Sequence, residues 1–462
     1  MAETGIQRAF ESPGVFWLPE KPDQKITGHL SHSLDDGPEV SLVGGFDHSL
    51  LKNFNVVHGV LEDAPCTLFN CKCISSKGSY FGLRQMAFKA DLLVVGEHVL
   101  SLDEPVFNGA TFRFGGLDEW VSFSAVKINF SETDIAKTPS RFDLLAQPPI
   151  VASSAELGGR VTLCGYYSGR FGHRKIDWTH HSFFEIEFGS AVSINVFYRS
   201  VFELQHLFAL LTWTRAPVSY LSARRYIAKT PMNQSGKQVS GLYGHWTATS
   251  EEDKTSSRDL FTSLALVWDD LPHIIVAWFK SSPAIKTARQ LLTSIVRSEG
   301  QYLEFKFLAL MQTAEALHRS LDARKYMPAA DYEKVRQALI AAIPGAVERS
   351  HRTSLESRIK YGNDLSLRTR LKELFFRLPE KLRPHVFRDG KALVDRAVDM
   401  RNTLVHPNTE GDSAQPDPNE IWRTTQRIKL LLTIVLLNEL GLSFDKIETI
   451  AKSGQWYPLF LD

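Results

Sequence analysis

The chain has 462 residues, well beyond the roughly 250 to 300 residues at which a single hydrophobic core stops growing, so we expect at least two domains. Its formal net charge is only +1, which gives no support for a protein that coats nucleic acid or binds an acidic partner through bulk charge. The charge is nevertheless uneven, with 28 basic and 22 acidic side chains after residue 280 against 25 and 30 before it.

The N-terminal part, residues 1–280, is expected to be rich in strands. Short β-branched or aromatic runs separated by Gly, Pro, Asn and Asp are typical of strands, and they cover Glu39 to Val43, Cys66 to Ser75, Leu92 to Val99, Trp120 to Phe130, Gly159 to Tyr167 and Phe183 to Val196. We expect one helix at about Val201 to Leu211, followed by two apolar runs, Leu260 to Val267 and Ile274 to Phe279. The pattern predicts a largely antiparallel β domain with a smaller α/β portion.

Four cysteines are too few to stabilise a chain of this size by disulfides, and the first residues lack the apolar stretch of a signal peptide. We therefore expect the protein in the reducing cytoplasm. Cys66, Cys71 and Cys73, with His58 upstream, could suggest zinc, but they lack the paired Cys-x-x-Cys spacing of most structural sites. Thiols on a strand are the favoured interpretation, and no metal or cofactor is predicted.

A basic, histidine-rich stretch runs from Arg170 to Lys175, with His180 and His181 shortly after it. Such a loop could contact a ligand. Surface loops of this composition are common, however, so an ordinary loop is the stronger interpretation.

After Ser281, Ser282 and Pro283, which favour a helix start, the apolar period changes from two to about three and a half residues. The C-terminal part, residues 281–462, is therefore expected to be an all-α bundle, which makes the chain a multidomain α+β protein. The expected helices are 303–321, 331–342, 354–361, 365–378, 391–405 and 421–440. The longest apolar run, Leu430 to Leu437, is far shorter than the roughly 20 residues of a membrane-spanning helix, so we expect a buried core helix and no membrane contact.

The helix expected at 391–405 carries the most informative residues. Val394, Val398, Arg401 and Val405 share one helical stripe, which places a full positive charge in an apolar seam. The neighbouring stripe is polar and contains Asp395, Asp399, Asn402 and His406. Pro407 disfavours the α conformation before it, so the helix should end near Val405 and leave His406 at its C-terminus.

Arginine and histidine together favour phosphate chemistry. A guanidinium can hold a phosphate and stabilise charge that develops on it, while a histidine near a helix C-terminus is suited to proton transfer. In RNA, the 2′-hydroxyl can attack the adjacent phosphorus with only this assistance. One bundle offers one residue of each kind, so a two-fold dimer would supply both an acid and a base.

These residues also resemble a known family. The segment Arg401-Asn402-Thr403-Leu404-Val405-His406 resembles the arginine, four to six residues, histidine signature of HEPN domains. The helix with Gln312, Glu315, His318 and Arg319 is similar to the opening helix of the ApeA-like HEPN group, and Gly14 to Pro19 with Gly28 to Leu30 resemble its N-terminal domain. The resemblance spans nearly the whole chain.

The resemblance implies a metal-independent endoribonuclease, usually dimeric through the HEPN domain, that cuts cellular RNA, for example tRNA, during phage infection. Arg401 and His406 would be catalytic, and Asn402 would orient them or contact RNA. Glu315 and Asp399 are weaker supporting candidates. The N-terminal region would recognise a phage-derived trigger and restrain the nuclease.

Other interpretations compete with these. Arg401 could form a structural ion pair with Asp395 or Asp399, His406 could only cap its helix, and Glu315 could pair with Arg319. The basic stretch Arg349 to Arg388 could bind RNA, with Arg368, Arg370, Lys372 and Arg377 as candidates, or could be a solvated face of the bundle.

At the level of function, the main alternative is a non-catalytic HEPN-type protein that only binds RNA or dimerises. A toxin held by a separate antitoxin is a variant of the nuclease hypothesis. The sequence has no lysine-containing phosphate loop, no serine nucleophile elbow and no His-Glu-x-x-His, so nucleotide hydrolysis, esterase and zinc-protease activities lack support.

Overall fold

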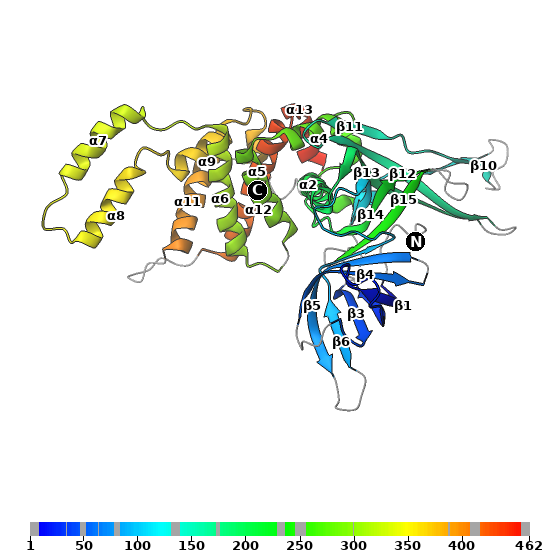
Figure 1. The fold of residues 1–462 in the computed structure, drawn as a ribbon. Helices are drawn as coiled ribbons and strands as arrows, with labels where there is room; N and C mark the ends of the chain where they lie inside the picture. Colours follow the sequence, from blue (N-terminus) through cyan, green and yellow to red (C-terminus); the bar gives the residue numbers. More distant parts are fainter. Residues whose placement is uncertain are drawn as a thin grey trace. The chain divides into compact units, whose positions relative to one another are not determined.

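The computed structural model describes residues 9–33, 35–46, 52–62, 64–77, 84–130, 139–171, 176–228, 236–244, 256–298, 300–386, 389–406 and 416–453. The chain divides into two compact units, residues 1–280 and 281–462. The first unit is built mainly from strands and the second from helices, in agreement with the predicted α+β class (Figure 1).

The described strands of the first unit pair only in antiparallel fashion. They are β1 Phe10–Trp17, β2 Ile26–Ser33, β3 Gly37–Val43, β4 Phe54–Leu61, β5 Ala64–Lys77, β6 Gln85–Lys89, β7 Leu92–Val95, β8 Phe107–Phe114, β9 Val126–Phe130, β10 Pro139–Leu144, β11 Ile150–Ser154, β12 Gly159–Phe171, β13 Ile176–Val192, β14 Val218–Tyr226 and β15 Lys237–Gly244. β9 and β10 form a separate hairpin. The others form one sheet in the order β11-β12-β13-β8-β14-β15-β7-β5-β4-β1-β2-β3-β6.

One part of this sheet closes on itself because β5 pairs with three strands. Its first half pairs with β7 and β4, and its second half pairs with β6, which completes a ring of β5, β4, β1, β2, β3 and β6. Asn70 lies between the two halves with a φ of 54°, a left-handed conformation that asparagine tolerates better than most residues. This backbone turn lets β5 leave β7 and continue beside β6.

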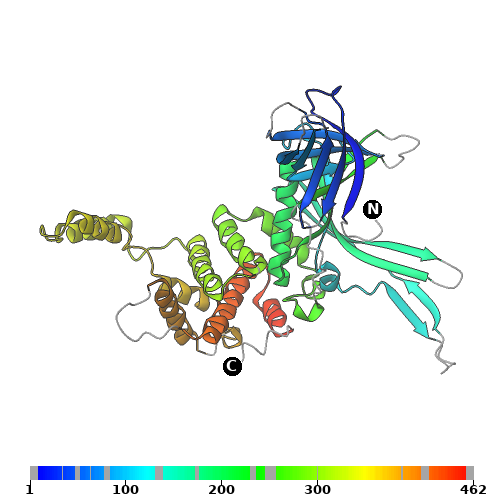
Figure 2. The same ribbon diagram turned by 90° about the horizontal axis from the view of Figure 1, so that it is seen from below.

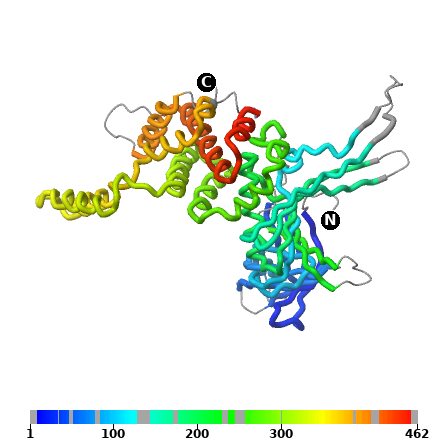
Figure 3. The backbone as a smooth tube through the Cα atoms, turned by 90° about the horizontal axis from the view of Figure 1, so that it is seen from above, coloured from blue at the N-terminus to red at the C-terminus, as the bar shows by residue number. Residues whose placement is uncertain are grey.

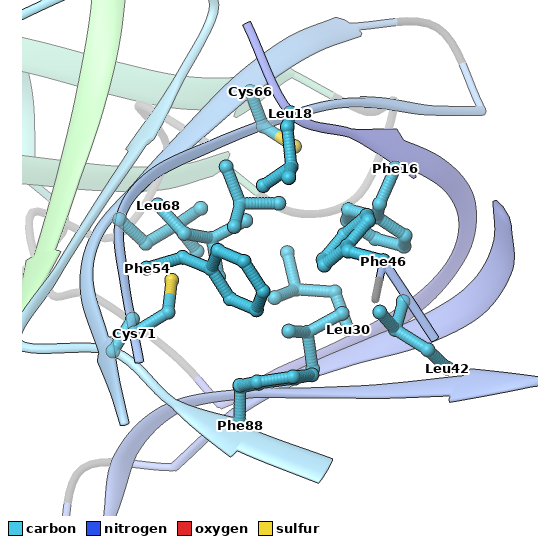
Figure 4. Close-up of a cluster of buried hydrophobic side chains, with 14 of the residues drawn as sticks. Phe16, Leu18, Leu30, Leu42, Phe46, Phe54, Cys66, Leu68, Cys71 and Phe88 are labelled. Carbon is cyan, nitrogen blue, oxygen red and sulfur yellow. The ribbon is translucent and has the colours of Figure 1, made fainter. Parts of the chain in front are cut away.

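Apolar side chains from the strands fill the interior of the ring (Figure 4). Phe16, Leu30 and Phe88 are fully buried there. Cys66 and Cys71 belong to the same core, and burial raises the pKa of each thiol to about 12. Among the described residues, no cysteine belongs to a group that could hold a metal ion, so these thiols act as small apolar side chains.

The open part of the sheet carries the helices of the first unit, which are α1 Leu117–Val121, α2 Ile194–Thr212, the 3-10 turn η1 Ser257–Asp259, α3 Leu264–Val267 and α4 Leu271–Lys280. Two strand predictions were too long here. Trp120 lies in α1, buried, where its indole N–H donates to Thr262. The strand predicted to reach Val196 stops at Val192, because the Ser193 side chain accepts a hydrogen bond from the Val196 N–H and starts α2.

The second unit contains the helices α5 Pro283–Arg297, α6 Leu303–Leu321, α7 Ala329–Ala341, α8 Arg349–Lys360, α9 Leu367–Phe376, α10 Arg383–Val386, α11 Gly390–Val405, α12 Pro418–Glu439 and α13 Phe444–Ser453. Four apolar residues of α6 at helical spacing form its buried seam, namely Phe307, Leu310, Ala314 and Leu317. The apolar run of α12 is buried as well. Among the described residues, no helix is both long and apolar enough to cross a membrane.

Helices α9 and α11 pack in opposite directions, which positions the predicted site. Arg368 near the start of α9 binds Asp399 in the second half of α11. Gly390, the first residue of α11, lies against Phe375 near the end of α9, so closely that a Cβ there would come within 2.2 Å of the ring. The C-terminus of α11 therefore lies toward the N-terminal end of α9.

Candidate functional site

The three residues of the predicted motif lie at the C-terminal end of α11, which ends at Val405 as the following proline predicts. His406 is the C-cap residue, and its backbone N–H donates to the Asn402 carbonyl at 2.8 Å. The Arg401 Nη1 donates to the Asn402 Oδ1 at 3.2 Å. Asn402 thus contacts both partners, one through its side chain and one through its backbone.

Burial decreases along the stripe that carries Arg401. Val394 and Val398 are buried, Arg401 is half-buried, and Val405 is 41% exposed. Asn402 and His406 are exposed. The guanidinium therefore lies at the edge of the apolar seam, where a phosphate could reach it from solvent.

The carboxylates that could have neutralised Arg401 bind another arginine instead. Arg368 reaches across from α9 and contacts Asp395 at 2.7 Å and Asp399 at 2.8 Å. Within the described residues, Arg401 forms no ion pair with a carboxylate. Neither Asp395 nor Asp399 neutralises Arg401 in this arrangement, because both bind Arg368.

Glu315 lies on α6 and is paired within its own helix. Its carboxylate accepts a hydrogen bond from Arg319 at 2.9 Å, one turn later. Arg319 also contacts Asp364 at 3.3 Å. This geometry favours the structural interpretation of Glu315, and its supporting role in catalysis stays a prediction.

The four candidates for RNA binding on α9 lie in different environments. Arg370 is buried and donates to the Leu365 carbonyl, and Arg377 forms an ion pair with Glu439 at 2.6 Å. Arg368 holds the two aspartates of α11. Lys372 is exposed, with its ammonium 5.8 Å from the centre of the Phe376 ring. Three of these four cations, Arg368, Arg370 and Arg377, are therefore engaged by partners within the second unit.

A second polar cluster lies between α6 and α9, beside a cavity of about 310 Å³. Arg370 is always protonated and can only donate, so the Nδ1 of His318 must accept its hydrogen bond at 3.1 Å. The Nε2 of His318 then carries the hydrogen that Glu373 accepts at 2.8 Å. This network fixes one tautomer of a buried histidine and ties α6 to α9.

His318, Asp322 and Glu373 could in principle hold a cation, because their ligand atoms all lie within 4.8 Å of one another. Two features oppose cation binding by these three residues. Arg324 already contacts both carboxylates, and its hydrogen bonds lower the pKa of Asp322 to about 2. In addition, the tautomer that Arg370 imposes removes the Nε2 lone pair that a metal would need. The cluster fits an ion-pair network.

In the first unit, His180 and His181 follow a loop whose residues 172–175 lie outside the described residues. His181 Nδ1 lies 3.1 Å from Asp118 Oδ2, and the same carboxylate accepts the Ser182 backbone N–H at 2.8 Å. Arg113 also binds Asp118. These bonds join the β12–β13 hairpin to α1, so His181 is occupied by structural partners here.

Two family models match this chain. The family model described as ApeA N-terminal domain 1 matches residues 11–278, and the model described as Apea-like HEPN matches residues 308–446. The first match covers more than half of the chain. The chain is an ApeA-like HEPN protein. Neither the curated proteins nor the solved structures gave a match.

In this ApeA-like HEPN protein, the residues matched by the HEPN model include Arg401 and His406. They also include the network around His318. A domain of this type carries a ribonuclease or defence role. The buried network was not predicted from the sequence, although His318 was placed on the opening HEPN helix. Its partners Arg370 and Glu373 lie more than 50 residues further along the chain, and no local pattern links them to His318.

Proposed function

We propose that this protein is a HEPN endoribonuclease that acts in anti-phage abortive infection and cuts host RNA, for example tRNA, without a metal ion. The observation that carries the proposal is the half-buried Arg401 without a carboxylate partner among the described residues, next to Asn402, which lies one turn before the exposed His406. A guanidinium in this position can hold a phosphate that approaches from solvent.

Each group has a role in the proposed reaction. The RNA 2′-hydroxyl attacks the adjacent phosphorus, and the 5′-oxygen of the next nucleotide leaves with a proton. His406 transfers a proton, Arg401 stabilises the charge on the phosphoryl oxygens, and Asn402 orients the guanidinium through its Oδ1. A second copy of α11 supplies the partner acid or base. The products would carry 2′,3′-cyclic phosphate and 5′-hydroxyl ends.

The first unit would hold the nuclease inactive and release it when a phage-derived trigger binds. Its closed ring and its open sheet offer a separate folded body for such recognition. Residues 11–278 match the family model described as ApeA N-terminal domain 1. Restraint within one chain would make a separate antitoxin unnecessary.

The test is to incubate the purified protein with total RNA in EDTA, with and without a trigger from phage-infected cells, and to analyse the ends of the fragments. Wild type should give discrete fragments with cyclic phosphate ends, and Arg401→Ala and His406→Ala should each lower the cleavage rate at least about 100-fold. Both residues lie at the helix end and contribute little to the core, so both variants should keep the wild-type melting temperature.

Full activity in either variant would refute the assignment of the site. Cleavage that disappears in EDTA would indicate a metal-dependent nuclease. RNA that is bound but never cut, with and without a trigger from phage-infected cells, would favour a non-catalytic binding protein.

A further inference from the structure

The helices α7 and α8 form a hairpin that belongs to the second unit but adds nothing to its core. Neither helix contains a buried residue. Figures 1, 2 and 3 show the hairpin extending from the other helices of its unit. Isolated helices of this length are marginal in water, so contacts outside the bundle core must hold the hairpin in this form.

The base of the hairpin is fixed firmly. Asn363 is buried, and its side chain accepts the Met327 N–H at 2.9 Å and donates to the Met327 carbonyl at 2.9 Å. Lys325 forms a bridge to Asp364, with an ion pair of 3.1 Å. Further out, the Tyr332 hydroxyl donates to the Ile359 carbonyl and holds α7 to α8. The hairpin is thus an arm with a defined direction.

Three of the acidic side chains on the arm are neutralised within their own helix. The pairs are Asp331 with Lys334, Glu333 with Arg336, and Glu356 with Arg352. Three exposed cations of α8, namely Arg349, Arg358 and Lys360, have no carboxylate partner among the described residues. The unmatched charge within α8 is therefore positive, while the exposed carboxylate of its N-cap residue Glu348 lies next to Arg349 and binds Ser350.

Arg349 and Lys360 are eleven residues apart, about three helical turns, so they lie on one face at a separation of about 16 Å along the axis. Tyr361 follows directly, 61% exposed, with the Lys360 ammonium 5.7 Å from its ring centre. Cations that follow a backbone, next to an exposed aromatic ring on which a base can stack, are the features that bind single-stranded RNA.

We propose that the α7–α8 arm binds a single-stranded part of the RNA substrate through Arg349, Lys360 and Tyr361. This inference rests on the proposed ribonuclease function, because it concerns the substrate of that site. A second copy of the chain fits this face less well, since two such faces would bring unmatched positive charges together. The arm contributes affinity by holding the substrate, and the chemistry stays at Arg401 and His406.

The test measures RNA binding by the full chain in the His406→Ala background, so that cleavage does not interfere. The probe is a fluorescent single-stranded RNA oligonucleotide followed by anisotropy at several salt concentrations. The double variant Arg349→Glu/Lys360→Glu should weaken binding at least tenfold near 100 mM salt. The slope of log K against log salt should fall by about 1.4, the value for two lost phosphate contacts on a single strand. Tyr361→Ala should weaken binding without changing this slope.

The matched control is Lys334→Glu/Arg358→Glu, which changes the charge of the same arm equally but on other faces. Binding that falls equally in the control, or falls in neither variant, overturns the proposal. A dimer that dissociates in Arg349→Glu/Lys360→Glu, with unchanged affinity per chain, would show instead that the arm joins two copies. Arm-dependent binding by a wild-type protein that never cuts RNA would leave this inference standing and refute the nuclease.

Discussion

Two arginines define the electrostatics of α11 at the scale of single residues. Arg368 binds Asp395 and Asp399, the two aspartates that precede the motif, and leaves Arg401 without either of them. The sequence placed Asp395, Asp399 and Arg401 on neighbouring stripes of one helix but could not assign the ion pairs, because Arg368 comes from a different helix. In the proposed function, the charge of Arg401 is the group that would bind a phosphate at this helix end.

Arg370 and Arg368 lie two residues apart and were predicted from the sequence to play the same role, yet their environments differ. Arg370→Ala should lower the free energy of unfolding by about 2 to 4 kcal/mol, because it removes a buried cation and leaves His318 and the Leu365 carbonyl without their donor. Arg368→Ala should cost at most about 1 kcal/mol, since its ion pairs are partly exposed.

Urea unfolding of the two variants would measure this difference. Equal losses would contradict the network around His318. The comparison also separates structural from functional arginines, because an RNA-binding role for Arg370 would show as lost affinity in a protein of normal stability.

At the scale of elements, the contact between α9 and α11 sets the position of the motif. Gly390 allows the start of α11 to lie against the buried Phe375 ring. Gly390→Ala should therefore displace α11 and lower the free energy of unfolding by about 1 to 3 kcal/mol, although alanine favours a helix more than glycine does. Gly345→Ala is the control, because nothing lies within 4 Å of a Cβ there.

Thermal unfolding would compare the two alanine variants. A wild-type melting temperature for Gly390→Ala would mean that Phe375 moves aside at little cost. In that case the close approach would not determine where α11 lies.

The observed elements agree with the sequence prediction where the spacing of apolar residues is regular over a long segment. The seam of α6 and the end of α11 agree with the pattern, because apolar spacing and a helix-stopping proline act locally. The strand predictions around Trp120 and Val196 extended into helices. A buried indole hydrogen bond to Thr262 and a serine cap decided those two positions, and aromatic or β-branched residues alone do not distinguish them from a strand.

At the scale of the whole molecule, the proposed active site needs two copies of α11. If the site is shared, Arg401→Ala and His406→Ala, each inactive alone, should recover part of the activity when they are mixed and allowed to exchange subunits. A mixed dimer would still contain one Arg401 and one His406 but would lack the second His406 as partner acid or base, so the recovery should be partial. The cleavage rate of the mixture and its mass in solution are the measurements.

A mixture that stays inactive while mass measurement shows mixed dimers would indicate that each chain needs its own Arg401 and His406. A protein that stays monomeric and active would refute the shared site altogether. His406→Ala mixed with wild type serves as the control for subunit exchange.

The sequence by itself determined the two-part organisation, the α+β class, the helical period of the second unit and the place where α11 ends. These features could be predicted because they depend on the local spacing of residues and because the sequence resembles a known family. The tertiary structure alone decided which charges meet, namely that Arg368 takes the aspartates of α11, that Arg370 is buried against His318, and that α8 keeps unmatched cations. Ion pairs between helices depend on packing over tens of residues, and a linear pattern does not record that packing.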